Sequence, residues 1–216
     1  MSARLAIFET FKTKKEELTG EAVRQRSIII TLATQNNPTD MTRTAIAQKI
    51  AQKNNTVWKN IYSGIFRDLD EILIPLEIVE EAGRLPLRRG PKALQEKGIP
   101  FYQLTLKGQL VAISLDELTD REKILESFIK TAKISDEFGE EIRILSKFVP
   151  SFAYYMFRNY VKAFCDGGLT DLLPLEKSKF LQFSEESISI QKEFLESFVS
   201  MSKQEKERTL SFLQGV

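Results

Sequence analysis

The chain has 216 residues, of which 42% are hydrophobic and 28% are charged, and its formal net charge is +1. This is the composition of an ordinary soluble protein that can bury one large core or two small ones. The longest apolar run, Ile28 to Ile30, is far too short to cross a bilayer, and charges among the first nine residues argue against a signal peptide.

Two residue types limit the chemistry that the chain can perform. Histidine is absent, which removes the usual general base, the usual triad partner and the commonest zinc ligand. Carboxylate or lysine chemistry stays open, but no catalytic constellation is recognisable, so we expect a protein that is not an enzyme and holds neither cofactor nor metal. Cys165 is the only cysteine, which excludes an internal disulfide and favours a reducing cytoplasm.

Charge is distributed unevenly along the chain. Residues 1–115 carry 17 Lys and Arg against 12 Asp and Glu, whereas residues 116–216 carry 14 against 18. Between residues 41 and 67 there are five basic side chains and no acidic one. A local positive field attracts polyanions even when the net charge is near zero, so the first half is the half expected to contact nucleic acid.

Helical spacing of apolar residues over Ala3–Leu18 predicts a short amphipathic helix. Within residues 1–20 this helix is expected either to pack on the domain that follows or to serve as a dimerisation arm. A second helix is predicted over Glu21–Thr34, and Asn36-Asn37-Pro38 ends it because proline lacks an amide donor.

The next segment predicts a helix-turn-helix. Thr42 is expected to cap a helix that runs to Lys53, Asn54-Asn55 forms the turn, and Asn55 caps a second helix over Thr56–Arg67. Val57, Trp58, Ile61, Ile65 and Leu69 fall on one arc of this helix and polar residues on the other. Such a polar face is usually only solvated, but the absence of acid favours a DNA groove. We expect Thr56, Lys59, Asn60 and Ser63 near base edges, Arg67 on the same face, and Arg43 and Lys53 on flanking phosphates.

A basic hairpin is predicted next. After a helical turn over Leu76–Ala82 that ends at Gly83, strands are expected at Arg84–Leu87 and Phe101–Leu106. The loop between them carries Arg88, Arg89, Lys92 and Lys97. Its Arg89-Gly90-Pro91 resembles the core of an AT-hook, in which arginine enters a narrow minor groove.

The hairpin carries a resemblance to a known family. Glu80-Glu81-Ala82-Gly83, the basic loop and Tyr102-Gln103-Leu104-Thr105-Leu106-Lys107-Gly108 resemble the wing of prokaryotic winged helix-turn-helix regulators of the broad MarR-like and PadR-like kind. In that family Tyr-x-Leu-Thr-x-Lys-Gly closes the second wing strand and opens a helix. The resemblance covers about residues 21–115 and implies a winged helix-turn-helix domain that binds double-stranded DNA. The chain differs from the family in a longer segment before the wing and in a long wing.

Residues 116–216 predict an all-α domain for dimerisation or for binding an effector or partner. Helices are expected at Thr119–Ala132, Ser135–Pro150, Ser151–Asp166, Asp171–Phe183, Glu185–Val199 and Lys203–Gln214. The aromatic residues of the third helix more often form a core or a dimer surface, but Tyr154, Tyr155 and Arg158 could line a pocket for a small-molecule effector.

The predicted fold is therefore mainly α, with an α+β winged helix-turn-helix half followed by an all-α half. The predicted function is that of a DNA-binding transcriptional regulator, a cytoplasmic prokaryotic homodimer that contacts an inverted repeat and no membrane. The alternative is a non-enzymatic winged-helix module for protein–protein contacts in a chromosome-associated or transcription assembly.

Overall fold

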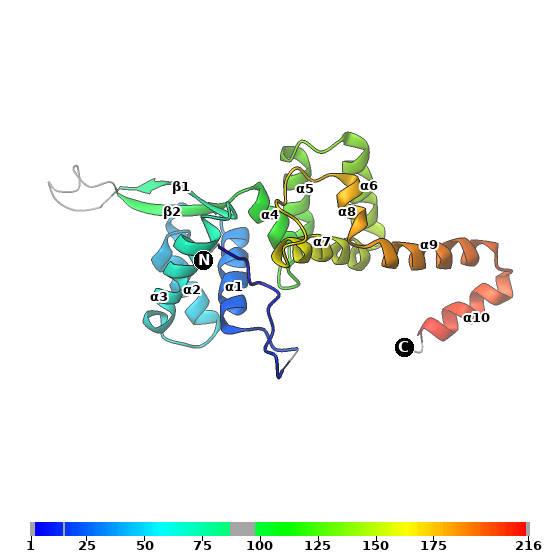
Figure 1. Cartoon of the computed structure of the whole chain (residues 1–216), viewed down its shortest axis with the longest axis horizontal. Coiled ribbons are helices and arrows are strands. Elements are labelled where there is room, and N and C mark those ends of the chain that lie inside the picture. Colours follow the sequence, from blue (N-terminus) through cyan, green and yellow to red (C-terminus); the bar gives the residue numbers. More distant parts are fainter. Residues whose placement is uncertain (1–2, 15, 87–97, 215–216) are drawn as a thin grey trace.

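The computed structural model describes residues 3–14, 16–86 and 98–214, which form mainly helices and one two-stranded antiparallel sheet (Figure 1). The first half contains α1 (Gly20–Thr34), a 3-10 turn (Pro38–Asp40), α2 (Arg43–Lys53), α3 (Trp58–Arg67), a π-helical turn (Asp68–Leu73), β1 (Val79–Leu85), β2 (Ile99–Leu104) and α4 (Leu106–Ile113). The second half contains α5 (Arg121–Thr131), α6 (Asp136–Phe148), α7 (Pro150–Cys165), α8 (Lys177–Gln182), α9 (Glu185–Ser200) and α10 (Lys203–Gln214).

The helices α1, α2 and α3 pack around a core of fully buried isoleucine and leucine side chains, among them Ile28, Ile46 and Ile65. The predicted cap of α2 is confirmed, since the side chain of Thr42 accepts a hydrogen bond from the backbone of Ala45. The predicted start of the next helix is wrong by two residues.

Asn55 adopts the left-handed conformation, with φ of 49°, and therefore serves the turn instead of capping a helix. Val57 is the N-cap of α3 without a side-chain hydrogen bond, and it is 58% exposed, although the sequence pattern placed it on the apolar face.

The sheet is a hairpin with an irregular register. Val79 pairs with Leu104, and a bulge between Glu81 and Gly83 shifts the pairing so that Gly83 lies opposite Phe101. On its other side β2 meets the residues just before α2, because the amide of Tyr102 donates to the carbonyl of Met41 at 3.0 Å.

Two predictions for this region were wrong. The helical turn predicted over Leu76–Ala82 is instead the approach to β1 and its first residues, and the strand predicted at Arg84–Leu87 begins earlier, at Val79. Glu77 has a left-handed backbone conformation, with φ of 56°, and this ends the preceding helical turn. In the residues that follow, strand pairing with β2 outweighs the helical preference predicted from the sequence.

The predicted N-terminal helix is also wrong. Leu5, Ala6 and Ile7 are buried in the core in a non-helical segment, and the amide of Ala6 donates to the buried side chain of Gln25 in α1 at 2.8 Å. Thr10 and Leu18 then form an isolated antiparallel bridge. The non-helical segment buries three consecutive side chains and makes a backbone hydrogen bond to α1, whereas an amphipathic helix would bury only one face.

The helix α4 joins the two halves of the molecule. It lies between the half formed by α1–α3 with the hairpin and the helices α5–α8 (Figure 1), and it contacts α1, α5 and α7. Its residues Leu110 to Ile113 are fully buried, so one continuous core runs through both halves. The predicted boundary at residues 115/116 falls in the loop that follows α4.

The second half is helical throughout its described residues, as predicted, apart from the loops between helices. Phe180 of α8 packs among the rings of Phe138, Phe157 and Tyr160 at centroid distances of 4.9 to 5.7 Å. The helix predicted over Asp171–Phe183 is correct only for Lys177–Gln182.

Residues 171–176 are not helical because Asp171 accepts a hydrogen bond from the backbone of Leu173, and Tyr160 donates to the carbonyl of Leu172. Beyond α8, α9 and α10 extend away from the rest of the molecule (Figure 1).

Candidate nucleic-acid interface

One face of α3 is a polar surface exposed to solvent. Lys59, Asn60, Ser63 and Arg67 are exposed on this face, while Ile65 on the opposite face is fully buried. The separation follows from the helical repeat, since residues 59, 63 and 67 recur every fourth position. The structure therefore brings together the four residues that the sequence analysis placed on this face. Thr56, expected beside them, is exposed in the turn before α3.

The orientation of α3 is fixed by an ion pair with α1. The guanidinium of Arg24 donates to the carboxylate of Asp68 at 2.8 Å, and the Asp68 side chain is completely buried. Arg24 crosses α3 at Gly64, where a Cβ would lie 2.9 Å from its Nε. The Arg24–Asp68 pair was not predicted from the sequence. Its available signal was the glycine inside an otherwise regular amphipathic pattern, which marks a close approach.

Arg24 and the polar face of α3 together border a surface hollow of about 410 Å³. Its lining is Arg24, Asn60, Ile61, Ser63, Gly64 and Arg67. The hollow therefore places two guanidinium groups, an amide and a hydroxyl on one surface, which are donors suited to phosphate oxygens and base edges.

The basic residues of this region differ in whether they are paired. Among the described residues, Lys53, Lys59 and Arg67 are exposed and make no ion pair. By contrast, most other described basic residues of the first half pair with a carboxylate: Arg4, Lys14, Arg24, Arg26, Arg43, Lys49, Arg84 and Lys107. The uncompensated positive charge of α2 and α3 is thus concentrated at the end of α2 and on the exposed face of α3.

Arg43 was expected to be free to bind a phosphate, but its guanidinium is engaged in contacts within the protein. Its guanidinium pairs with Asp70, lies 4.3 Å from the centroid of the Phe66 ring, and lies 5.2 Å from that of Tyr102. Its side chain is 23% exposed. Arg43 therefore ties α2 to the end of α3 and to β2, and a phosphate would have to compete with Asp70 for it.

The described strands of the hairpin carry both signs of charge. Arg84 pairs with Glu81 at 2.6 Å, and Glu80 accepts a hydrogen bond from Gln103 across the strands. The predicted basic residues Arg88, Arg89, Lys92 and Lys97 lie outside the described residues. Their assignment to the minor groove stays a prediction.

At the end of the hairpin, the contacts of Thr105, Lys107 and Gly108 account for the residue types found there. Thr105 caps α4 by accepting a hydrogen bond from the amide of Gly108 at 3.1 Å, and its hydroxyl donates to the carbonyl of Glu77. A Cβ at Gly108 would lie 2.1 Å from the carbonyl oxygen of Ile78. Lys107 pairs with Glu77 and Asp171 at 2.5 and 3.0 Å. The segment therefore binds the hairpin to both α4 and the helical half.

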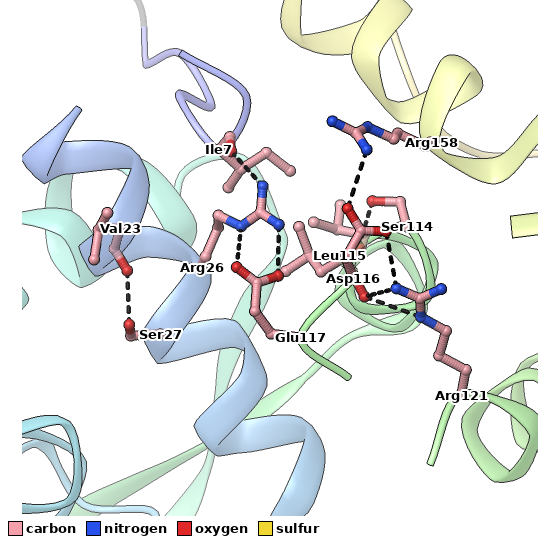
Figure 2. A network of polar contacts seen from close by, with 11 residues as sticks. Ile7, Val23, Arg26, Ser27, Ser114, Leu115, Asp116, Glu117, Arg121 and Arg158 are labelled. Carbon is pink, nitrogen blue, oxygen red and sulfur yellow. Dashed lines mark hydrogen bonds and ion pairs between the residues drawn. The ribbon is translucent and has the colours of Figure 1, made fainter. Parts of the chain in front are cut away.

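A polar network connects α1 to the second half (Figure 2). Arg26 of α1 donates to Glu117 at 2.8 Å and to the carbonyl of Ile7 at 3.2 Å. In the same loop after α4, Asp116 pairs with Arg121 and Arg158 at 3.1 and 3.0 Å. This loop thus receives charged partners from α1, α5 and α7.

The residues of the predicted effector pocket do not line one cavity. Tyr154 lies beneath the guanidinium of Arg121 at 4.8 Å, whereas Tyr155 borders a separate hollow and accepts a hydrogen bond from Ser187. Arg158 is engaged with Asp116 and lies 5.7 Å from the Phe8 ring. The three side chains therefore serve different contacts.

Several features bear on other chemistry. Burial, together with the nearby Asp166, raises the pKa of the Cys165 thiol to about 12, so this thiol is protonated at neutral pH and is a poor nucleophile. Within residues 3–14, 16–86 and 98–214, no three His, Cys, Asp or Glu side chains are grouped to hold a metal. The described helices also include none whose length and hydropathy would span a membrane.

No protein-family model, curated protein or solved structure matches the chain. The interpretation of this surface therefore depends on its own geometry and charge.

Proposed function

We propose that the chain is a DNA-binding transcriptional regulator in which residues about 21–115 act as a winged helix-turn-helix. α3 enters the major groove, with Thr56, Lys59, Asn60 and Ser63 toward base edges and Lys53 and Arg67 toward phosphates. The basic loop of the hairpin contacts the minor groove or backbone. The function requires no catalysis and no cofactor.

The observation that carries this proposal is the unpaired state of Lys53, Lys59 and Arg67 in a half whose other described bases are mostly paired. A base already paired with a carboxylate gains little from a phosphate, because it must first give up its partner. When an unpaired, exposed basic side chain contacts a phosphate, condensed counterions are released from the DNA. This release supplies much of the binding free energy.

Dimensions support the same role for α3. Ten residues of helix extend roughly 15 Å, and the B-DNA major groove is about 12 Å wide, so the polar face of α3 can lie within the groove. In a homodimer with two-fold symmetry, two copies of α3 would contact the two halves of an inverted repeat.

The experiment that tests the proposal compares two charge-removing variants. Lys53→Ala combined with Arg67→Ala should weaken binding to all duplexes and lower the slope of log K against log salt by about 2, since each lost phosphate contact contributes about 0.9. The control is Lys130→Ala on α5, which removes an equally exposed base from the second half. Fluorescence anisotropy with a labelled duplex at several salt concentrations measures both.

Equal salt slopes for the wild type and the double variant would contradict the placement of α3. Absence of wild-type binding at low salt, over a random pool of duplexes, would contradict DNA binding itself and favour the protein-contact alternative. Selection of bound sequences from the same pool would test whether the exposed face also reads sequence.

A further inference from the structure

The helices α9 and α10, residues 185–214, form an arm without a core of its own. No residue of either helix is buried, and seven of their large apolar side chains are exposed: Ile190, Phe194, Leu195, Val199, Leu210, Phe212 and Leu213. Figure 1 shows both helices extending beyond α7 and α8, away from the rest of the molecule. Contiguous exposed apolar surface of this kind marks an interaction site.

The apolar residues are arranged in stripes. On α9, Ile190, Phe194 and Phe198 recur every fourth residue, and the rings of the last two stack with centroids 5.8 Å apart. Leu195 and Val199 form a neighbouring row with the same spacing. Helices with such stripes are stable in water when a second helix covers the stripe.

The two helices of one chain do not cover each other. Their described polar contacts lie at the turn, where Lys206 donates to the carbonyl of Val199 at 3.0 Å and Thr209 donates to the sulfur of Met201 at 3.6 Å. The side chains of Leu195 and Leu213 remain 58% and 47% exposed. The cover must therefore come from outside this chain.

The exposed apolar area matches what one partner contributes to a stable interface. An aromatic side chain presents roughly 150–250 Å² when fully exposed and the aliphatic ones present less, so the seven residues, at exposures of 38% to 75%, together present on the order of several hundred Å². A standard protein interface buries about 800 Å² per partner. Two arms packed together would thus form an interface of ordinary size.

Charge favours a second arm as the partner. α9 carries Glu185, Glu186, Glu193 and Glu196 against Lys192, whereas α10 carries Lys203, Lys206 and Arg208 against two glutamates. Among the described residues, the first three of these glutamates, together with Lys203 and Arg208, make no ion pair. An acidic helix and a basic helix on the same chain are self-complementary when two copies meet about a two-fold axis.

We propose that the arm is the dimerisation element, in which α9 of one copy packs on α10 of a second copy and the reverse, giving a four-helix arrangement. This inference does not rest on DNA binding.

The first test measures mass by light scattering and affinity by sedimentation of the full chain without DNA. The wild type should have twice the chain mass of 24.8 kDa. Leu195→Glu combined with Leu213→Glu should raise the dimer dissociation constant by at least about a hundredfold, since the variant places one charge on the exposed apolar surface of α9 and one on that of α10. The circular dichroism of the variant should match that of the wild type diluted until it is monomeric, because both substituted side chains are exposed.

The matched control is Ile144→Glu combined with Phe148→Glu, which alters two apolar side chains of α6 that are 50% and 72% exposed. This variant should remain dimeric. A monomeric wild type at tens of micromolar would overturn the proposal, and so would a dimer that the α6 variant dissociates while the arm variant does not. Neither result would bear on whether DNA binds.

A second test uses charge. One chain carries Glu185→Lys, Glu186→Lys and Glu193→Lys, and another carries Lys203→Glu and Arg208→Glu. Each alone should dimerise weakly because like charges face each other, and mixing the two should restore a heterodimer detectable by mass. Failure of the mixture to associate more tightly than either chain alone would overturn the pairing of α9 with α10.

Discussion

Gly108 is the residue at which the hairpin and α4 approach most closely. Its backbone amide donates to Thr105, and the space that a Cβ would occupy is taken by the carbonyl oxygen of Ile78. A backbone atom cannot move aside as the end of a long side chain can. Glycine is therefore required here by packing, and the Thr105-to-Gly108 segment can be explained without reference to any ligand.

Gly108→Ala should lower the free energy of unfolding by about 1–3 kcal/mol, the usual range for overpacking. Gly20→Ala is the control, because the nearest atom to a Cβ there is 4.0 Å away and Gly20 lies in the first turn of α1. That variant should be neutral or slightly more stable. Urea unfolding of both variants measures the difference. Equal stabilities would show that α4 can shift away from Ile78 at little cost.

At the scale of elements, the sequence predicted best what local hydrogen bonds decide. Thr42 caps its helix as expected, Ser135 caps the helix that was predicted to begin there, and the Ser202 and Glu205 side chains exchange hydrogen bonds with the start of α10. The four residues grouped on α3 were predicted for the same reason, since helical spacing alone places them together. The fold class, mainly helical with a small sheet, follows from these local signals.

The largest errors arose where distant contacts decide. β1 is a strand because β2 pairs with it, and the N-terminal segment is extended because Gln25 binds its backbone. The Arg24–Asp68 pair joins residues 44 positions apart, so the local pattern could indicate a close approach at Gly64 but not the residue that makes it. The apolar stripes of the arm were recognisable as helices, but their exposure became evident only in three dimensions.

The contact between Arg26 of α1 and Glu117 after α4 makes one link between the two halves sensitive to pH. Burial is the largest single influence and would raise the pKa of the Glu117 carboxyl, but the hydrogen bonds from Arg26, a backbone hydrogen bond and the charge of Arg26 together outweigh it and hold the pKa below its usual value of 4.5. Because the folded-state pKa is lower than the unfolded one, this contact stabilises the fold above pH 4.5. The stabilisation is lost as the pH falls through the folded-state pKa.

Glu117→Gln should therefore be less stable than the wild type at pH 7, and the two should converge as the pH falls below 4.5. Glu71→Gln, which alters an exposed carboxylate with no ion pair among the described residues, should show no such convergence. Urea midpoints at a series of pH values measure both. A stability difference that is constant with pH would mean that Glu117 acts through packing and not through its charge.

At the scale of the whole molecule, α3 and the arm lie toward opposite ends, with α4 and the helices α5–α8 between them (Figure 1). The continuous core from Leu5 to Phe180 makes these intervening helices a single packed body. If the arms join two copies, each dimer carries two α3 surfaces at a separation set by this body. Binding one half-site then raises the effective concentration of the second α3 at the other half-site.

Together, DNA binding by α3 and dimerisation by the arm predict a difference between half-site and full-site binding. The arm variant Leu195→Glu with Leu213→Glu should bind a single half-site as the wild type does, since α3 is unchanged, but should lose about a hundredfold in affinity for the full inverted repeat. Anisotropy with half-site and full-site duplexes, taken from the sequences that selection recovers, measures the two affinities at protein concentrations where the variant is monomeric. The Ile144→Glu with Phe148→Glu variant should behave as the wild type on both duplexes. Equal loss on both duplexes would instead mean that the arm supports α3 directly, because avidity can act only where two half-sites are present.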